Sequence, residues 1–220
     1  MQSTEQLDEI WQDRAIESII NFVRSADGDF NCIEKLANAV SDPDSLQKIV
    51  EFLSSTSQGK QAFQKRPLLG NIDLQKLHRL PTNSLGYSFA NHLLTNNLQP
   101  LQRKSVENDY EFFAAHITET HDLWHIVTGC DTNILGEIQL EAFYVAQLYA
   151  SRFWLALITK NLLKTVIYDI ELSTTYMDAI AKGWVMAKQA KPLFGIEWNL
   201  LWETPLEDVR NSLNIILPSS

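Results

Sequence analysis

The chain has 220 residues and a mass of about 25 kDa, enough for one large domain or two small ones with a sizeable core. Acidic residues outnumber basic residues 27 to 18, giving a formal net charge of −9. This balance argues against a nucleic-acid-binding protein, because such proteins need a basic surface. The two cysteines, Cys32 and Cys130, are too few for a disulfide framework or a cysteine-based metal site.

The N-terminal 57 residues are expected to form a helical segment. Apolar residues from Leu7 to Val23 follow the spacing of one helix face, and a second helix is expected over 31–40. Asp42 and Pro43 then provide a capping side chain and a proline at the first helical position, which predicts a helix through Leu53. The start of the chain is acidic and resembles neither a signal nor a transit peptide, so we expect a cytoplasmic location, with peripheral attachment to a membrane as an option.

Residues 58–81 form the best candidate for a boundary or a long connection, because they contain Pro67, Gly70 and Pro81. The stretch 60–104 is basic, and we interpret it either as a solvated face or as a surface for anionic lipid or phosphate. The expected domain then covers residues 58–216, with the segment 1–57 packed on it. Further helices are expected over 72–79, 84–97, 105–128, 136–168, 172–189 and 204–213. In that last helix Thr204 and Glu207 would form a capping box. These elements predict an all-α fold.

The most apolar stretch of the chain runs from Ala142 to Thr159. Its length approaches that of a membrane span, but Gln147, Ser151 and Arg152 interrupt it. A central arginine alone costs roughly 2.5–3.5 kcal/mol on membrane-insertion scales. We therefore predict a buried core helix and no transmembrane segment.

Three of the five histidines fall within ten residues, at positions 116, 121 and 125. On an α-helix His121 and His125 lie about 40° apart and one turn apart along the axis, with Asp122 between them. This spacing is the one that helical metal sites use. The breaker-rich run VTGCDTNILGE can reverse the chain and bring Glu137 back to the pair. The alternative is a structural, hydrogen-bonded cluster at a helix–helix contact.

Four protein ligands in a tetrahedron favour zinc, and magnesium, manganese and iron remain alternatives. If only two histidines and one carboxylate bind, the site resembles a non-haem iron centre with open positions. We expect Glu119 or backbone carbonyls to accept hydrogen bonds from the ligating imidazoles. His78 and His92 are interpreted as ordinary residues on a helix surface.

An apolar channel is predicted beside the motif. Leu140, Tyr144 and Gln147 follow Glu137 along one face of its helix, and Phe113 and Ile117 precede His121 at the same spacing. In an antiparallel hairpin these side chains would lead away from a charged end, as a prenyl lipid or a prenyl phosphate requires. The alternative is that they simply form core.

The motif His121-Asp122-x-x-His125, followed by eleven residues and Glu137, resembles the signature of the ubiquinone (coenzyme Q) biosynthesis protein four family. The turn Thr132–Glu137 also looks like the turn of that family. The resemblance covers roughly residues 58–216, and the first 57 residues are similar only in helical character. Weaker similarities occur in the family's order at Lys65-Arg66-Pro67, Leu80-Pro81, Ser84-Leu85-Gly86, Trp202-Glu203, Leu206, Arg210, Leu213 and Ile215.

The resemblance implies a divalent metal, usually taken as zinc, held by His121, Asp122, His125 and Glu137. Members of the family work on membranes with polyisoprenoid quinone intermediates, organise other biosynthetic enzymes and are implicated in removing the ring carboxyl at C1. The expected function is therefore a metal- and isoprenoid-binding protein of quinone biosynthesis, acting as a scaffold or as an oxidative decarboxylase. The expected partners are a prenyl lipid, the other quinone-biosynthesis enzymes and a membrane surface, with a homodimer as an option.

This sequence departs from the family pattern near the motif. His116-Ile117-Thr118 replaces the usual Arg-Tyr-Arg before it, Glu141 stands for a lysine, and Tyr144 stands for a glutamate. Two functions from other classes remain open on the residues alone. One is a metal-dependent phosphohydrolase with a His-Asp dyad, which would need His92 or His116 upstream and Asp131 or Asp169 downstream. The other is a helical interaction module without a metal.

Overall fold

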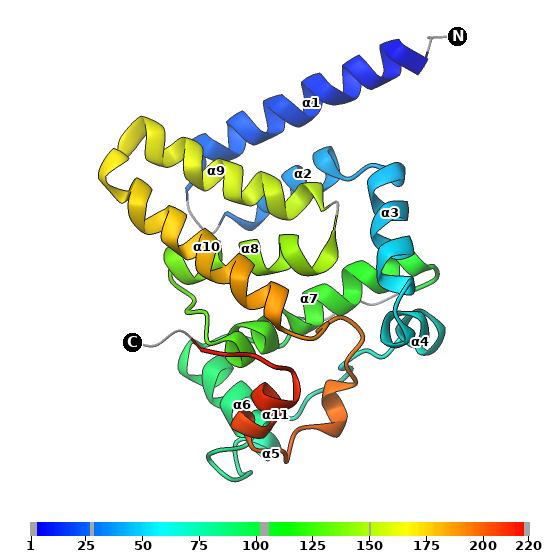
Figure 1. Ribbon diagram of the computed structural model, residues 1–220, viewed down its shortest axis with the longest axis vertical. Coiled ribbons are helices and arrows are strands. Elements are labelled where there is room, and N and C mark those ends of the chain that lie inside the picture. Colours follow the sequence, from blue (N-terminus) through cyan, green and yellow to red (C-terminus); the bar gives the residue numbers. More distant parts are fainter. Residues whose placement is uncertain (1–3, 27–28, 102–105, 150, 218–220) are drawn as a thin grey trace.

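The computed structural model describes residues 4–26, 29–101, 106–149 and 151–217, and in these ranges every regular element is a helix (Figure 1). The predicted all-α fold is therefore confirmed. The α-helices are α1 (Thr4–Arg24), α2 (Phe30–Val40), α3 (Pro43–Ser54), α4 (Ser57–Lys65), α5 (Leu74–Leu77), α6 (Leu85–Thr95), α7 (Asp109–Thr128), α8 (Ile134–Leu148), α9 (Arg152–Tyr168), α10 (Ser173–Gln189) and α11 (Leu206–Ser212). Two 3₁₀ turns, η1 (Ile170–Leu172) and η2 (Trp198–Leu200), complete the described chain.

The N-terminal helices share their core with the rest of the chain. Asp42 accepts a hydrogen bond from the Ser45 amide, as its position before Pro43 predicts. Phe22, Leu36 and Leu53, from the first, second and third helices, belong to the same buried cluster as residues of α7 and α8. The division at residue 57 stays a prediction, but the packing crosses it. Helix α4 lies within the stretch expected to be a connection.

The helix expected over 136–168 is in fact two antiparallel helices, α8 and α9. The chain turns at Tyr149, which has a φ of 54°, and Ser151 is extended. The sequence has no glycine or proline there to signal the break, so the pattern of apolar residues looks continuous. The turn brings Trp154 of α9 onto Tyr144 of α8, with ring centroids 4.0 Å apart. Burial of these aromatic rings stabilises the reversal.

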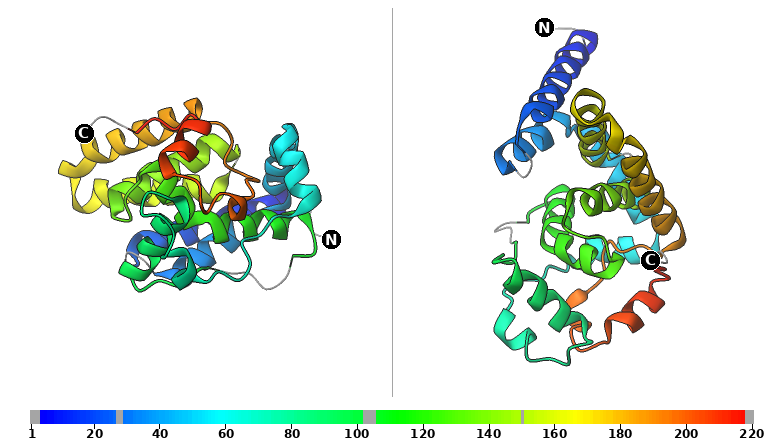
Figure 2. Two further views of the ribbon diagram at one scale, coloured as in Figure 1. Left: turned by 90° about the horizontal axis from the view of Figure 1, so that it is seen from below. Right: turned by 90° about the vertical axis from the view of Figure 1, so that its left-hand side faces the viewer.

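Helix α10 then also packs on α8, so that α8 is in contact with α7, α9 and α10 (Figures 1 and 2). Helices α8 and α10 approach so closely that a Cβ at Gly183 would collide with the carbonyl oxygen of Gln139. None of the described helices is both long enough and apolar enough to cross a bilayer.

The capping box expected at Thr204 is absent, and this prediction is wrong. Helix α11 begins after Pro205 without a side-chain cap, and Glu207 pairs with Arg210 instead. The Thr204 carbonyl accepts a hydrogen bond from the Leu85 amide. This hydrogen bond to the start of α6 holds the backbone at Thr204, where the sequence pattern predicts a helix cap.

Candidate metal centre

The α7–α8 hairpin brings the motif histidines and Glu137 together. Helix α7 ends at Gly129, whose φ of 70° is readily accessible only to glycine. The Asn133 side chain accepts hydrogen bonds from the amides of Leu135 and Gly136 and so starts α8. A Cβ at Gly136 would collide with the backbone of Asp131, so the turn requires glycine there. The predicted chain reversal is confirmed.

Three potential ligand atoms converge inside this hairpin. The Nε2 atoms of His121 and His125 lie 3.2 Å apart, and Oε1 of Glu137 lies 3.3 Å from Nε2 of His125. The other oxygen of Glu137 is 4.0 Å from Nε2 of His121. These three residues offer ligand atoms that all lie within 4.8 Å of one another. This is the spacing of groups that can share one metal ion.

The surrounding hydrogen bonds fit a metal at this point. Nδ1 of His125 lies 3.0 Å from the Cys130 carbonyl oxygen, to which it can only donate, so in the neutral imidazole Nε2 carries the lone pair. Nδ1 of His121 lies 3.3 Å from the Tyr144 hydroxyl. When both Nδ1 atoms carry hydrogen, the two Nε2 lone pairs face each other beside a carboxylate. A cation between them removes this repulsion, and such outer hydrogen bonds are typical of metal-ligating histidines.

Charge and burial act in opposite directions on the three groups. Burial opposes protonation of His125, but its hydrogen bond to Glu137 and the charge of that carboxylate outweigh burial and raise the pKa of His125. Burial and the neighbouring His125 lower the pKa of His121. Burial favours the neutral form of Glu137, but the two histidines outweigh it and lower its pKa. Glu137 is therefore an anion, and in the absence of a metal ion it favours the protonated form of His125.

Asp122 lies outside this group of three. Its Oδ1 is 3.9 Å from Nε2 of His92 on α6, and both side chains are largely buried. The expectation that His92 is an ordinary residue on a helix surface is wrong, because α6 packs against α7 and the His92 side chain is largely buried. No local pattern could have revealed it, since His92 comes from a different helix. Asp122 as a metal ligand stays a prediction.

His116 and Glu119 hold loops rather than the metal centre. Nδ1 of His116 donates to the Pro67 carbonyl, its Nε2 accepts from the Gly195 amide, and burial lowers its pKa to about 4. Glu119 accepts a hydrogen bond from the Leu69 amide at 2.8 Å, and its expected contact with the ligating histidines stays a prediction. His78 stacks on Tyr87 and is only partly buried.

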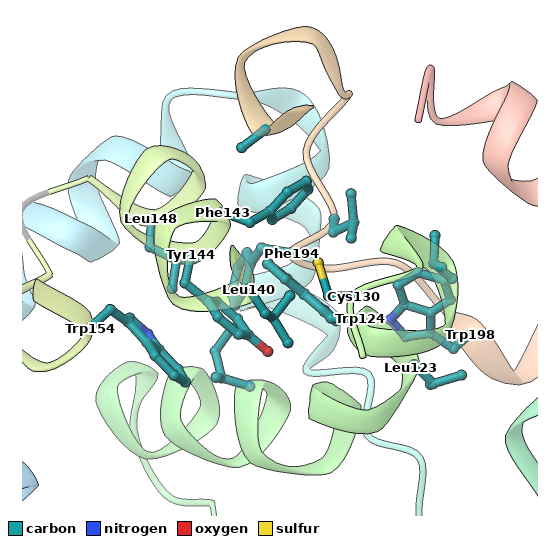
Figure 3. Packing of buried hydrophobic residues seen from close by; sticks show 14 of the residues in the cluster. Leu123, Trp124, Cys130, Leu140, Phe143, Tyr144, Leu148, Trp154, Phe194 and Trp198 are labelled. Atoms are coloured by element: carbon teal, nitrogen blue, oxygen red, sulfur yellow. The ribbon is translucent and has the colours of Figure 1, made fainter. Parts of the chain in front are cut away.

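The side chains predicted to line a lipid channel are packed into the core. Phe113, Ile117, Leu140 and Tyr144 are each at most 9% exposed and belong to the main buried cluster. Tyr144 lies between the rings of Trp124 and Trp154, as Figure 3 shows. The structure thus favours the alternative that these residues are core.

The fifth predicted channel residue, Gln147, has a different task. Its amide nitrogen donates to the Ala187 carbonyl at 3.1 Å, and its oxygen accepts from the Leu193 amide at 3.0 Å. These bonds satisfy backbone groups at the end of α10 and in the following loop. Gln147 is therefore an anchor between α8 and the C-terminal part of the chain.

Glu141, one turn after Glu137, is a buried carboxyl group. It accepts a hydrogen bond from Asn161 of α9 at 3.2 Å. Burial and the nearby Glu137 raise its pKa to about 8, so it is largely protonated at neutral pH. It therefore adds no full negative charge beside the metal centre.

We expect Glu141→Gln to stabilise the protein increasingly as the pH rises from 4.5 to 8. The folded protein keeps a proton on Glu141 that the unfolded chain releases, so the wild type loses stability across this window. Each unit of pKa shift corresponds to about 1.4 kcal/mol, so the gain at pH 8 should be a few kcal/mol. Urea unfolding at several pH values measures it, with the exposed Glu34→Gln as control. Equal stabilities of wild type and variant across the window would contradict this assignment.

Comparisons with known proteins assign the chain to one family. The model of the family described as coenzyme Q (ubiquinone) biosynthesis protein Coq4 matches residues 9–219. The match therefore includes most of the first 57 residues, for which the sequence showed only helical character. Those helices carry no chemically distinctive motif, so their similarity to the family cannot be recognised from this sequence alone.

Individual relatives agree with this match. The chain is 28% identical to the mitochondrial ubiquinone biosynthesis protein COQ4 homolog of Mus musculus, over 79% of the chain and 66% of that protein. It is 26% identical to mitochondrial COQ4 of Eremothecium gossypii, over 94% of the chain and 66% of that protein. The chain thus spans slightly less than two thirds of the length of these relatives. Their names place them in mitochondria, and a cytoplasmic location for this chain stays a prediction.

A solved structure supports the fold. The crystal structure of a protein from Nostoc punctiforme PCC 73102, whose name refers to ubiquinone biosynthesis, superposes with a TM-score of 0.83. The superposition covers 92% of this chain and 97% of that chain, at 24% sequence identity. The helical arrangement described above is therefore shared with an experimentally determined protein.

Proposed function

Because the chain belongs to the Coq4 family of coenzyme Q (ubiquinone) biosynthesis proteins, we propose that it acts in ubiquinone biosynthesis by binding a divalent metal and the polar head of a prenylated ring intermediate. The observation that carries this proposal is the convergence of His121, His125 and Glu137 within 4.8 Å. It acts either as a scaffold that presents the intermediate to other enzymes of quinone biosynthesis or as the ring C1 oxidative decarboxylase.

The metal would be held by both imidazole Nε2 atoms and the Glu137 carboxylate, with Asp122 as the proposed fourth ligand. Zinc suits this mixture of nitrogen and oxygen donors, and iron, manganese or magnesium are the alternatives. When bound, the ion would act as a Lewis acid toward an oxygen of the ring or its carboxylate. The Cys130 carbonyl holds His125 in the required tautomer, and the Tyr144 hydroxyl lies against His121.

The intermediate would approach from the side of Glu137 and His121. The Glu137 side chain is 38% exposed and that of His121 is 26% exposed, whereas that of His125 is 2% exposed. Because the residues expected to hold the tail are core, we propose that the prenyl tail stays in a membrane and that the protein binds that membrane peripherally.

A phosphohydrolase with a His-Asp dyad is less well supported. His92 does approach Asp122, as the phosphohydrolase hypothesis requires. His116, the other candidate, instead forms hydrogen bonds with two backbone groups. The downstream candidates Asp131 and Asp169 do not join the group of three potential ligands. The dyad thus lacks the second carboxylate on which that chemistry depends.

The proposal is tested by purifying the full chain without chelators and analysing it for metals and co-purified lipids. We expect about one equivalent of a divalent metal and a prenylated aromatic compound detected by mass spectrometry. Incubation with a prenylated aromatic carboxylic acid and dioxygen then separates the two roles, because only an oxidative decarboxylase consumes the oxidant and releases the ring carboxyl as carbon dioxide. A protein that carries neither metal nor prenyl compound, and binds neither when they are added, would instead be a metal-free interaction module.

A further inference from the structure

His92 and Asp122 face each other beside the candidate metal centre. His92 lies on α6 and Asp122 on α7, directly after His121, and the two helices pack together. Their side chains are 18% and 15% exposed, and Oδ1 of Asp122 lies 3.9 Å from Nε2 of His92. Ala90 and Leu93 of α6 are fully buried. The core therefore fixes the position of His92 relative to α7.

The imidazole of His92 has an unsatisfied hydrogen-bonding group. Its Nε2 atom is buried and has no hydrogen-bond partner among the described residues, and 3.9 Å to Asp122 is too long for a hydrogen bond. Such an unpaired buried group costs free energy and calls for an explanation. A carboxylate only accepts hydrogen bonds, so Nε2 must carry the hydrogen to pair with Asp122. A side-chain movement of about 1 Å brings the two atoms to hydrogen-bonding distance.

The place of Asp122 on α7 indicates what the pair is for. Its side chain lies about 100° around the helix from that of His121 and about 60° from that of His125, so it borders the group of three potential ligands without belonging to it. The Asp122 carboxylate is attracted to a cation held by that group. It has two oxygens, so one can bind a cation while the other accepts a hydrogen bond. Hydrogen bonds of this kind orient ligating carboxylates in metal sites.

We propose that His92 is a positioning residue that acts through Asp122. The Nε2–H group of His92 donates to one oxygen of the carboxylate and so presents the other oxygen as the fourth metal ligand. His92 does not itself bind the metal, because its Nε2 faces Asp122 and is not among the converging ligand atoms. The proposal rests on the metal centre of the proposed function. The alternative is that the pair merely ties α6 to α7.

Titration of the zinc-loaded full chain with a competing chelator tests the proposal. His92→Phe keeps a ring of similar size and removes the donor, whereas His92→Gln keeps an amide hydrogen at the height of Nε2. We expect His92→Phe to raise the Kd for zinc about 10–100-fold, the effect of losing an outer hydrogen-bond partner, and His92→Gln to recover most of this loss. His78→Phe is the matched control, because His78 contacts Tyr87 instead, and its Kd should equal that of the wild type.

A double-mutant cycle separates positioning from simple packing. Asp122→Asn should weaken zinc binding at least as much as His92→Phe. The double variant should bind zinc no more weakly than Asp122→Asn alone, because His92 acts only through that carboxylate. Cobalt-loaded protein gives a second readout, since its visible absorption reports the ligands of the ion. The spectra of His92→Phe and Asp122→Asn should change in the same way, and that of His78→Phe should not change.

Other outcomes would overturn the proposal. A wild-type Kd in His92→Phe that is folded by circular dichroism, with or without a lower melting temperature, would show that the pair only ties α6 to α7. Losses that add in the double variant, or a loss that His92→Gln does not reduce, would show that His92 does not act through Asp122. These results leave the metal centre intact. A wild type that binds no metal would overturn both the metal centre and the role of His92, so the two failures are distinguishable.

Discussion

His125→Ala should abolish stoichiometric metal binding. Its Nε2 is the atom that lies within 3.3 Å of both other ligand groups, so its removal leaves no compact donor set. Loss of an outer hydrogen-bond partner alone weakens metal binding 10–100-fold, so loss of this ligand should exceed about 100-fold. The measurement is metal content after equilibrium dialysis, together with the dissociation constant from titration with a competing chelator.

His78→Ala is the matched control, because His78 lies directly after α5, away from the metal centre, and contacts Tyr87 instead. The helical circular dichroism of both variants should equal that of the wild type, since the large core does not depend on the ion. Retention of one tight equivalent of metal by His125→Ala would show that the ion binds elsewhere. Loss of most helical signal on chelation would show that the metal is needed for folding.

Tyr144→Asp should destabilise the whole fold. Tyr144 is fully buried between two tryptophans, and burial raises its pKa well above the usual value, so it is neutral. Removal of a buried aromatic ring costs about 3–5 kcal/mol, and an unpaired buried carboxylate costs several more. This sum is comparable to the whole stability of a typical domain, about 5–15 kcal/mol. Urea or thermal unfolding measures the loss.

Tyr144→Phe keeps the stacked rings and removes only the hydroxyl beside His121. We expect it to cost less than about 1.5 kcal/mol, in the range of a single hydrogen bond. If Tyr144→Asp instead folds with wild-type stability and loses only the binding of a prenyl ligand, these side chains line a channel and the core assignment is wrong.

Much of the fold followed from local signals. Asp42 before Pro43 marks the start of α3, and the run from Gly129 to Gly136 marks the α7–α8 turn. The break at Tyr149 could not be predicted, because a tyrosine at positive φ has no sequence signature and the reversal is stabilised by the stacking of Trp154 on Tyr144. The missing cap at Thr204 has the same origin, since α6 binds that backbone segment.

The candidate metal centre was predictable where its members share one hairpin. His121, His125 and Glu137 are joined by a helix of known pitch and a turn rich in glycine and asparagine. The neighbourhood of Asp122 was not predictable, because His92 approaches it from α6. The helical spacing correctly predicts that Tyr144 lies on the same face of α8 as Glu137. Spacing alone does not tell whether that face lines a cavity or, as in the structure, packs against Trp124 and Trp154.

The most direct test of the metal centre is a crystal structure of the metal-loaded protein with anomalous diffraction data recorded on both sides of the metal's absorption edge. We expect one anomalous peak, about 2.0–2.2 Å from Nε2 of His121, Nε2 of His125 and an oxygen of Glu137 if the metal is zinc. The same map shows whether Asp122 is the fourth ligand or stays with His92. A peak away from these three residues, or none at all in protein loaded to one equivalent, would show that His121, His125 and Glu137 do not form the metal centre.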